Sequence, residues 1–165
     1  MNKPWVLIVM GSDSDAEVMS QAAAALDEAG VPYEFTVASA HRSPERTKQV
    51  VTEAEANGAR VFIAGAGMAA HLPGVVASLT TRPVIGVPLA SGALQGVDAL
   101  YAVVQMPPGI PVASVAIGGA RNAGILAAQI LAAGDEELAS RLKQQRLAMA
   151  DAVAAKSKKV EKSTR

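Results

Sequence analysis

Short apolar runs alternate with helical stretches along this chain, and no other feature constrains its fold as strongly. Residues 6–10 are wholly apolar, largely β-branched, and followed by Gly11, a pattern typical of a strand buried on both faces of a sheet. Further runs of strand-forming residues predict strands at 33–38, 60–64, 83–87 and 112–117. Strands that alternate with helices favour a parallel sheet covered on both sides. The sequence therefore predicts a single-domain, flavodoxin-like α/β fold of three layers with a five-stranded parallel sheet.

Local signals predict where the first two helices begin and end. Ser14 and Glu17 form an S-x-x-E capping box, after which apolar residues recur at helical spacing until Gly30. Ser43 is the expected N-cap of the second helix, with Pro44 at its first helical position. Each of these helices then follows a strand through a short loop, as βα units require.

The C-terminal third of the chain departs from the strand–helix alternation. An Ala-rich helix is predicted after Gly119 and ends at Gly134, and acidic residues at 135–137 open a further helix outside the sheet pattern. Residues 156–165 are polar, mostly basic and without period. We expect one catalytic domain over residues 1–155, which includes this extra C-terminal helix, and a solvated, disordered tail over 156–165.

The composition excludes several classes of protein. Fifteen basic residues balance fifteen acidic ones, so no overall field favours nucleic acid or a membrane as the partner. The chain has no cysteine, which excludes thiol nucleophiles and fits a reducing compartment. The first residues lack the features of a secretory signal, and no apolar run approaches the roughly 20 residues that span a bilayer. We expect a cytoplasmic protein.

The loop after the first predicted strand combines glycine, serine and aspartate. A glycine turn that opens a helix exposes backbone N–H groups at the positive end of the helix dipole. Gly11 together with the hydroxyls of Ser12 and Ser14 therefore suits a phosphate. A carboxylate repels phosphate, so Asp15 is expected to accept hydrogen bonds from a sugar diol. Simple helix capping is the alternative interpretation, and the residues alone leave both open.

The loop after the second predicted strand places an imidazole beside a guanidinium. Arg42 can pair with a phosphate in bidentate fashion, and His41 can exchange protons near neutral pH. Ser39 and Ala40 precede them and are expected to contact the same ligand. A surface histidine that caps a turn is the alternative interpretation of the same residues.

The loop predicted after the third strand, at 65–74, is rich in glycine and alanine. Its G-x-G-x-x-A pattern imitates a dinucleotide fingerprint, but that fingerprint belongs on the first strand and needs an acidic residue about twenty positions later, where 85–91 has none. Gly67 and Ala70 are instead expected to form a tight apolar floor where the backbone approaches a small ligand. His71 is as compatible with a structural role as with a catalytic one.

Four motifs occur in order along the chain: MGSDSD at 10–15, SAHR at 39–42, AGAGMAAHLPG at 64–74 and QMPPGIPV at 105–112. Together, in order and spacing, they strongly resemble the N5-carboxyaminoimidazole ribonucleotide mutase family, and the resemblance runs from about residue 6 to about residue 142. The resemblance implies a substrate whose carboxyl group moves from an exocyclic nitrogen to carbon four of an aminoimidazole ribonucleotide. It also implies that no cofactor or metal is used and that the chain forms a homo-octamer.

The resemblance assigns roles to residues in the first two motifs. Ser12 and Asp15 would grip the nucleotide, and Arg42 would bind the phosphate. His41 would be the catalytic residue, moving a proton between the exocyclic nitrogen and the ring carbon as carbon dioxide leaves and is recaptured.

The third motif would confine that carbon dioxide away from water. Gly67 and Ala70 would form the apolar wall, and His71 and Leu72 would close the pocket. Family members often have glycine where this chain has Met68. The predicted substrate-binding residues are, in full, Gly11, Ser12, Ser14, Asp15, Ser39, Ala40, Arg42, Gly67, Ala70, His71 and Leu72.

Two other functions fit parts of the sequence. A phosphoribosylaminoimidazole carboxylase that uses free carbon dioxide shares most of these motifs. A non-catalytic nucleotide-binding or receiver-like module shares the fold class, because a fold does not fix a function. The receiver interpretation is disfavoured because the ends of the fourth and fifth predicted strands carry no acidic residue. Neither histidine belongs to a zinc, P-loop or nucleophile-elbow pattern.

Overall fold

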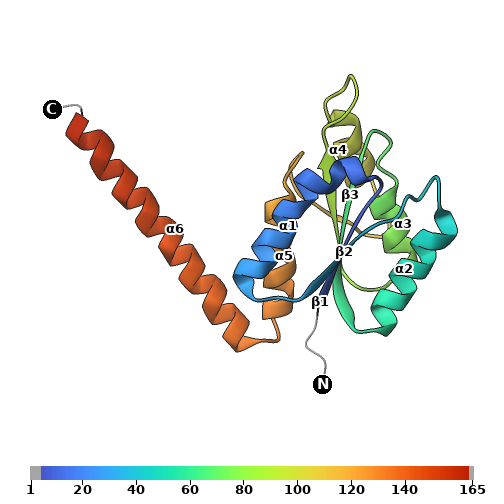
Figure 1. Cartoon of the computed structure of the whole chain (residues 1–165), viewed down its shortest axis with the longest axis horizontal. Helices are drawn as coiled ribbons and strands as arrows, with labels where there is room; N and C mark the ends of the chain where they lie inside the picture. Colours follow the sequence, from blue (N-terminus) through green and yellow to red (C-terminus); the bar gives the residue numbers. More distant parts are fainter. Residues whose placement is uncertain (1–4, 164–165) are drawn as a thin grey trace.

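The computed structural model describes residues 5–163 of the chain. Five strands alternate with helices in the predicted manner, and a long helix follows them (Figure 1). In chain order the elements are β1 (Trp5–Met10), the 3₁₀ turn η1 (Asp13–Asp15), α1 (Ala16–Ala29), β2 (Tyr33–Val37), α2 (Pro44–Ala56), β3 (Ala59–Gly67), α3 (Leu72–Leu79), β4 (Val84–Leu89), α4 (Val97–Val104), β5 (Ala113–Ser114), α5 (Ala120–Ala132) and α6 (Glu136–Ser163).

The five strands form one parallel sheet in the order β2-β1-β3-β4-β5. This is the doubly wound, flavodoxin-like order, so the predicted fold class is confirmed. Figure 1 shows α1 and α5 on one face of the sheet and α2 and α3 on the other. The order reverses between β1 and β3, and in open α/β sheets ligands bind at such a switch point, beyond the carboxyl ends of the strands.

The wholly apolar sequence of β1 is explained by burial on both faces. Val6, Ile8 and Met10 belong to the core beneath α1 and α5, whereas Leu7 and Val9 belong to the core beneath α2 and α3. All five are at most 1% exposed. Alternate side chains of a strand point to opposite faces, so a strand between two helical layers has no polar position.

The third strand is longer than predicted and the fifth is shorter. Residues 65–67 are not loop, because Gly65 and Gly67 pair in parallel register with Val87 and Leu89 of β4. Glycine hides the strand signal, yet it is needed here: a Cβ on Gly65 would lie 2.4 Å from the Met19 sulfur. β5 pairs over two residues only, where apolar content alone had predicted six.

The predicted S-x-x-E capping box is wrong. Three residues of η1 separate the loop from α1, so Ser14 lies before the helix rather than at its N-cap. Ser12 caps the turn instead, since its hydroxyl accepts a hydrogen bond from the Ser14 backbone N–H. Ser43 does lie at the N-cap of α2, but its hydroxyl makes no cap bond to the helix. Gly30 ends α1, as predicted, and adopts the left-handed conformation.

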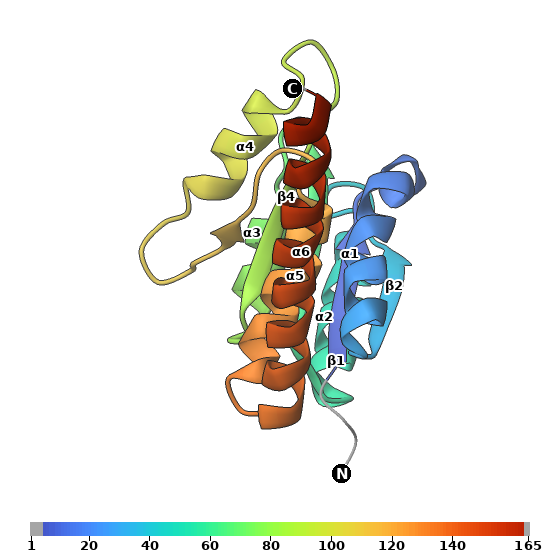
Figure 2. The same ribbon diagram turned by 90° about the vertical axis from the view of Figure 1, so that its left-hand side faces the viewer.

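The extra C-terminal helix is present and extends into the segment predicted as a tail, of which residues 164–165 lie outside the described residues. α6 continues through residues 156–163, because this segment contains no glycine or proline and its lysines and glutamate favour helix even without an apolar period. Its first turns pack on the domain, with Leu138 buried and Arg141 donating a hydrogen bond to the Ala29 carbonyl. Figure 1 shows the rest of α6 diverging from the sheet domain, and in Figure 2 this helix lies in front of α5. No helix in residues 5–163 has the length and apolarity needed to cross a membrane.

Candidate active site

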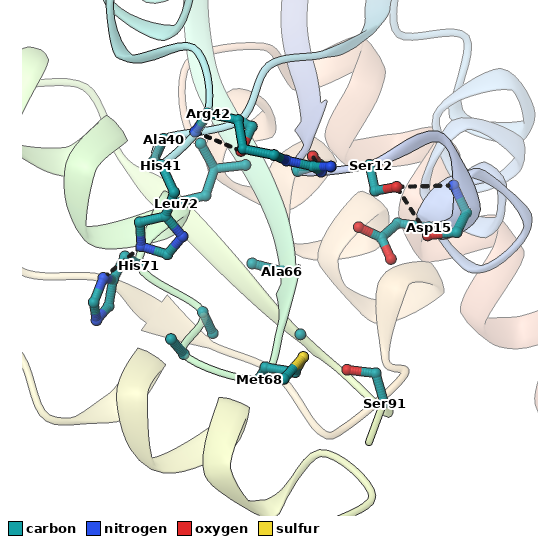
Figure 3. Close-up of a pocket in the computed structure, with 16 residues that line it drawn as sticks. Ser12, Asp15, Ala40, His41, Arg42, Ala66, Met68, His71, Leu72 and Ser91 are labelled. Atoms are coloured by element: carbon teal, nitrogen blue, oxygen red, sulfur yellow. Dashed lines mark hydrogen bonds between the residues drawn. The ribbon is translucent and has the colours of Figure 1, made fainter.

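A cavity of about 490 Å³ lies where the loops after β1, β2, β3 and β4 converge. Every residue predicted as catalytic or substrate-binding lines it, which brings together three segments separated by up to sixty positions in the sequence. Figure 3 shows the imidazoles on one side of this cavity and Ser12 with Asp15 on the other. Arg42 lies between these two sides in the same view.

The serines of the first loop form a compact polar wall. The Ser14 hydroxyl donates to the Ser12 oxygen at 3.0 Å, and the Ser12 hydroxyl donates to the Asp13 carboxylate at 3.1 Å. Asp13 also accepts the Ser14 backbone N–H at 3.0 Å. These exposed groups are directed by hydrogen bonds within the loop, so their hydroxyls are preorganised to meet a polar ligand in the cavity.

Asp15 presents a half-buried carboxylate to the same cavity. Burial raises the pKa of the Asp15 carboxyl; a hydrogen bond with the Ser12 backbone and the Arg42 cation lower that pKa, and the neighbouring Asp13 raises it. The net direction is upward, so the folded protein disfavours the ionised form. A carboxylate that lacks full hydration is well suited to accept hydrogen bonds from a ligand's hydroxyl groups.

Hydrogen bonds within the second loop hold the SAHR segment in a tight turn. Ser39 and Ser43 close it through two contacts: the Ser39 N–H donates to the Ser43 hydroxyl at 3.1 Å, and the Ser43 N–H donates to the Ser39 carbonyl at 2.9 Å. The Arg42 backbone N–H donates to the Ser39 hydroxyl at 3.2 Å. The Arg42 guanidinium then reaches across to donate to the Gly11 carbonyl at 3.0 Å, joining the first two loops.

The two histidines of the chain meet at the far side of the cavity. The His41 Nε2 and His71 Nδ1 atoms are 2.7 Å apart, and the two rings meet edge to face with an interplanar angle of 74°. Both side chains are exposed to the cavity or to solvent. The sequence did not predict this contact, because the two residues belong to different loops thirty positions apart.

The third loop approaches the ligand with its backbone. Met68 and Ala70 both have positive φ values, 53° and 40°, a conformation that residues with a side chain rarely adopt and that concentrates at functional sites. A Cβ on Gly67 would lie 2.5 Å from the Ser91 hydroxyl, so a larger residue there would require the Ser91 side chain to move. Ala70 and Leu72 are almost fully buried and anchor the loop.

Four residues that line the cavity were not predicted as site residues: Ala66, Met68, Ala69 and Ser91. Ser91 follows β4 by two positions. The rule that ligands bind beyond the carboxyl ends of parallel strands would have found it, but its segment contains no motif that points to chemistry. Among residues 5–163, no group of His, Asp and Glu side chains is arranged to hold a metal ion.

Comparison with known proteins gives matches over nearly the whole chain. Residues 5–152 match the family model described as AIR carboxylase. An N5-carboxyaminoimidazole ribonucleotide mutase of Pyrococcus horikoshii is 54% identical, over 96% of this chain and 90% of that protein. A phosphoribosylaminoimidazole carboxylase of Saccharomyces cerevisiae is 49% identical over 98% of this chain but only 28% of its own length. The crystal structure of Treponema denticola PurE superposes with a TM-score of 0.87 at 31% identity, covering 94% of this chain and 98% of that chain.

Asp15→Asn is expected to raise the thermal stability of the protein at pH 7.5. Because the pKa of Asp15 is raised on folding, the ionised carboxylate costs stability above that raised pKa, and the cost vanishes below the ordinary carboxyl pKa. We expect the melting temperature to rise by about 1–2 °C at pH 7.5, since solvent screens a partly exposed carboxylate, and to be unchanged near about pH 3.5.

The matched control is Asp151→Asn on the exposed part of α6, which should leave the melting temperature unchanged at both pH values. A loss of stability in Asp15→Asn at pH 7.5 would contradict the proposed cost of the buried charge.

Proposed function

The chain belongs to the AIR carboxylase family, and we propose that it converts N5-carboxyaminoimidazole ribonucleotide to 4-carboxy-5-aminoimidazole ribonucleotide, with His41 transferring the proton. The chain is an isomerase of purine biosynthesis, as are relatives that share about half of its residues over nearly the full length of both proteins. The assignment of residues rests on one observation: His41 lines the same cavity as Ser12 and Arg42, whose hydroxyl and guanidinium groups can donate hydrogen bonds to an anion.

The phosphate of the ribonucleotide binds on the side of the cavity formed by the first loop. The Ser12 and Ser14 hydroxyls lie there, 3.0 Å from each other. The Arg42 guanidinium is also within reach, held at the Gly11 carbonyl. Arg42 exchanges this carbonyl for the phosphate, because a charge-assisted bidentate pair is stronger than a single bond to a neutral acceptor. Asp15 accepts hydrogen bonds from the ribose hydroxyls.

This arrangement directs the aminoimidazole ring toward His41. The bond between the exocyclic nitrogen and the carboxyl carbon breaks, carbon dioxide is released, and the nitrogen receives a proton from the His41 imidazolium. Carbon four of the ring then attacks the carbon dioxide, and His41 removes the proton left on that carbon, which restores the aromatic ring. One proton is given and one is taken back, so the cycle needs no cofactor.

The apolar third loop keeps the carbon dioxide near the ring. Ala66, Ala70 and Leu72 are at most 8% exposed and line the cavity, and Gly67 adds no side chain to it. A wall without hydrogen-bonding side chains neither hydrates carbon dioxide nor holds a competing water. His71 and Leu72 close the pocket at this wall.

A carboxylase that uses free carbon dioxide is the second candidate, because the part of the yeast carboxylase that matches this chain is 49% identical to it. The chain spans only 28% of that protein, whereas it spans 90% or more of the mutases of Pyrococcus horikoshii and Thermotoga maritima. The agreement in length favours the mutase.

We also propose that the chain assembles into an octamer. The octamer acts in the cytoplasm and has no nucleic-acid or membrane partners. Two exposed apolar surfaces support it. Val97, Tyr101 and Val104 form a stripe at helical spacing along α4, and each is 45% exposed or more. On α6, Met149 and Val153 are at least 55% exposed. Such surfaces on one small domain are typical of subunit contacts.

Sedimentation velocity tests the assembly. We expect a single species of eight 16.8 kDa chains at micromolar concentration, because the apolar surfaces of α4 and α6 are then covered. Tyr101→Glu, which places a charge in the α4 stripe, should shift the distribution to smaller species. A fully active wild-type monomer would contradict this part of the proposal.

Arg42→Ala is expected to weaken binding of the ribonucleotide product by about 2–3 kcal/mol, roughly 30- to 150-fold in Kd, because a charge-assisted phosphate contact is lost. Isothermal calorimetry measures the change. Arg46→Ala is the matched control, since Arg46 lies one turn away and bonds to the Val37 carbonyl outside the cavity. Equal affinities for the two variants would mean that the first two loops cap their helices and do not bind the phosphate.

His41→Gln is expected to abolish turnover while ligand affinity changes little. Glutamine keeps one polar group near the position of Nε2 but cannot exchange a proton near neutral pH, and such proton transfer contributes typically about 10²-fold or more. Turnover of the N-carboxylated substrate and calorimetric product affinity separate the two effects. A variant that retains more than about a tenth of wild-type turnover would remove His41 from the proton-transfer role.

Labelled bicarbonate distinguishes the mutase from the carboxylase. If the third loop retains the released carbon dioxide, product formed early in the reaction should carry mainly the substrate's own unlabelled carboxyl group. Mass spectrometry of the first turnovers measures the label before the reverse reaction mixes the pools. Product that carries the full label of the solvent from the start would assign the chain to the carboxylases.

A further inference from the structure

The contact between His41 and His71 restricts where the protons of the pair can lie. The His41 Nε2 and His71 Nδ1 atoms are 2.7 Å apart, at the short end of the range for hydrogen bonds to nitrogen donors. A hydrogen bond at this distance holds one proton between the two atoms. Two imidazoliums would place two N–H groups face to face, and two unprotonated nitrogens would oppose two lone pairs. One histidine therefore donates and the other accepts.

Only one of these two arrangements allows His41 to give and take a proton while the contact remains. If His71 donates, the His41 Nε2 can receive no proton, and a neutral His41 carries its only proton on Nδ1, so it could act as an acid only by becoming an anion. If His41 donates, its Nε2 keeps a proton throughout, and its Nδ1 is free to cycle between protonated and unprotonated forms.

We infer that His71 is a positioning residue whose Nδ1 accepts the His41 Nε2–H, fixing the tautomer of His41 and leaving Nδ1 as the nitrogen that exchanges protons with the substrate. This inference rests on the proposed function of His41. Figure 3 shows the His41 ring between the His71 ring and the rest of the cavity, in accord with this order of contacts. The arrangement matches the general pattern in which a catalytic base is oriented by a third group.

The backbone around His71 is held in place from both sides. Ala70 before it is 3% exposed and Leu72 after it is 2% exposed. Ala70 adopts a positive φ of 40° and donates its N–H to the Gly67 carbonyl, a strained turn that persists only where surrounding contacts enforce it. The His71 carbonyl accepts the first hydrogen bond of α3, from Val75.

The His71 ring takes no part in capping α3. Although His71 lies at the N-cap, its side chain makes no cap bond, and Nδ1 is directed to His41 instead. The charged groups that share the cavity are Asp15 and Arg42, and the hydrogen bonds of the Arg42 side chain run to the first loop and Ser39. Within the described residues, His71 is the hydrogen-bond partner of the His41 ring.

Nitrogen NMR tests the tautomer directly, because the chain has only two histidines. Full-length protein without a histidine tag, labelled with ¹⁵N-histidine, is measured without ligand at a pH at which both rings are neutral. We expect His41 to show a protonated Nε2 and an unprotonated Nδ1. His71→Leu identifies the His41 signals and should convert them to a tautomer average. The inference would be overturned if His41 of the wild-type protein exchanged between its two tautomers, or if it carried its proton on Nδ1.

Kinetics with two His71 variants test the effect on catalysis. His71→Leu should lower kcat about 10-fold or more with little change in KM, because second-layer partners of this kind orient the reacting group. His71→Asn places an amide oxygen near the Nδ1 position and should recover most of that loss, together with the single His41 tautomer. An asparagine variant as slow as the leucine variant, or a rise in KM with unchanged kcat, would overturn the positioning role.

The two experiments also separate this inference from the function on which it rests. A wild-type protein that shows the single His41 tautomer but does not isomerise the substrate would overturn the mutase proposal and support the histidine pair. An active mutase in which His71→Leu leaves both the His41 tautomer and kcat unchanged would overturn the positioning role of His71 and leave the mutase proposal intact.

Discussion

The central strands β1 and β3 are buried on both faces, and the position of every cavity residue depends on that burial. In β1 the five residues from Val6 to Met10 are at most 1% exposed. Each such side chain contributes about 1.5–3 kcal/mol relative to exposure. A shift of one residue in the register would move each of them into the opposite core, where its shape does not fit the close packing. The fixed register, with Met10 opposite Gly65, brings the loops after these strands to one edge of the sheet.

Small residues allow the helical layers to come close to the sheet and to one another. A Cβ on Gly124 of α5 would lie 2.5 Å from the Ala22 carbonyl of α1, and one on Gly86 of β4 would lie 2.4 Å from Val103. With aromatic residues at only 3% of the chain, close backbone approach replaces bulky side chains in filling the core. The resulting scaffold is rigid enough to hold the strained residues Met68 and Ala70 beside the cavity.

The candidate site combines two kinds of order. Hydrogen bonds within each loop fix local shape, as between Ser39 and Ser43. Hydrogen bonds between loops then position the side chains of the site: Arg42 bonds to Gly11 across the sheet edge, and His41 bonds to His71. The proposed isomerisation needs both, because the phosphate and the reacting ring must be held at once at opposite sides of one cavity.

The sequence by itself determined the strand–helix alternation, the parallel sheet and most of the residues that line the cavity, because apolar period and glycine turns are local signals. It misplaced the end of β3 and the start of α1, where glycine and a 3₁₀ turn obscure those signals, and it missed Ser91, whose segment has no chemical motif. Only the tertiary structure decided that His41 meets His71 and that α6 continues to Ser163 away from the domain. Distances between side chains on different loops depend on strand register and helix packing, and no local pattern contains that information.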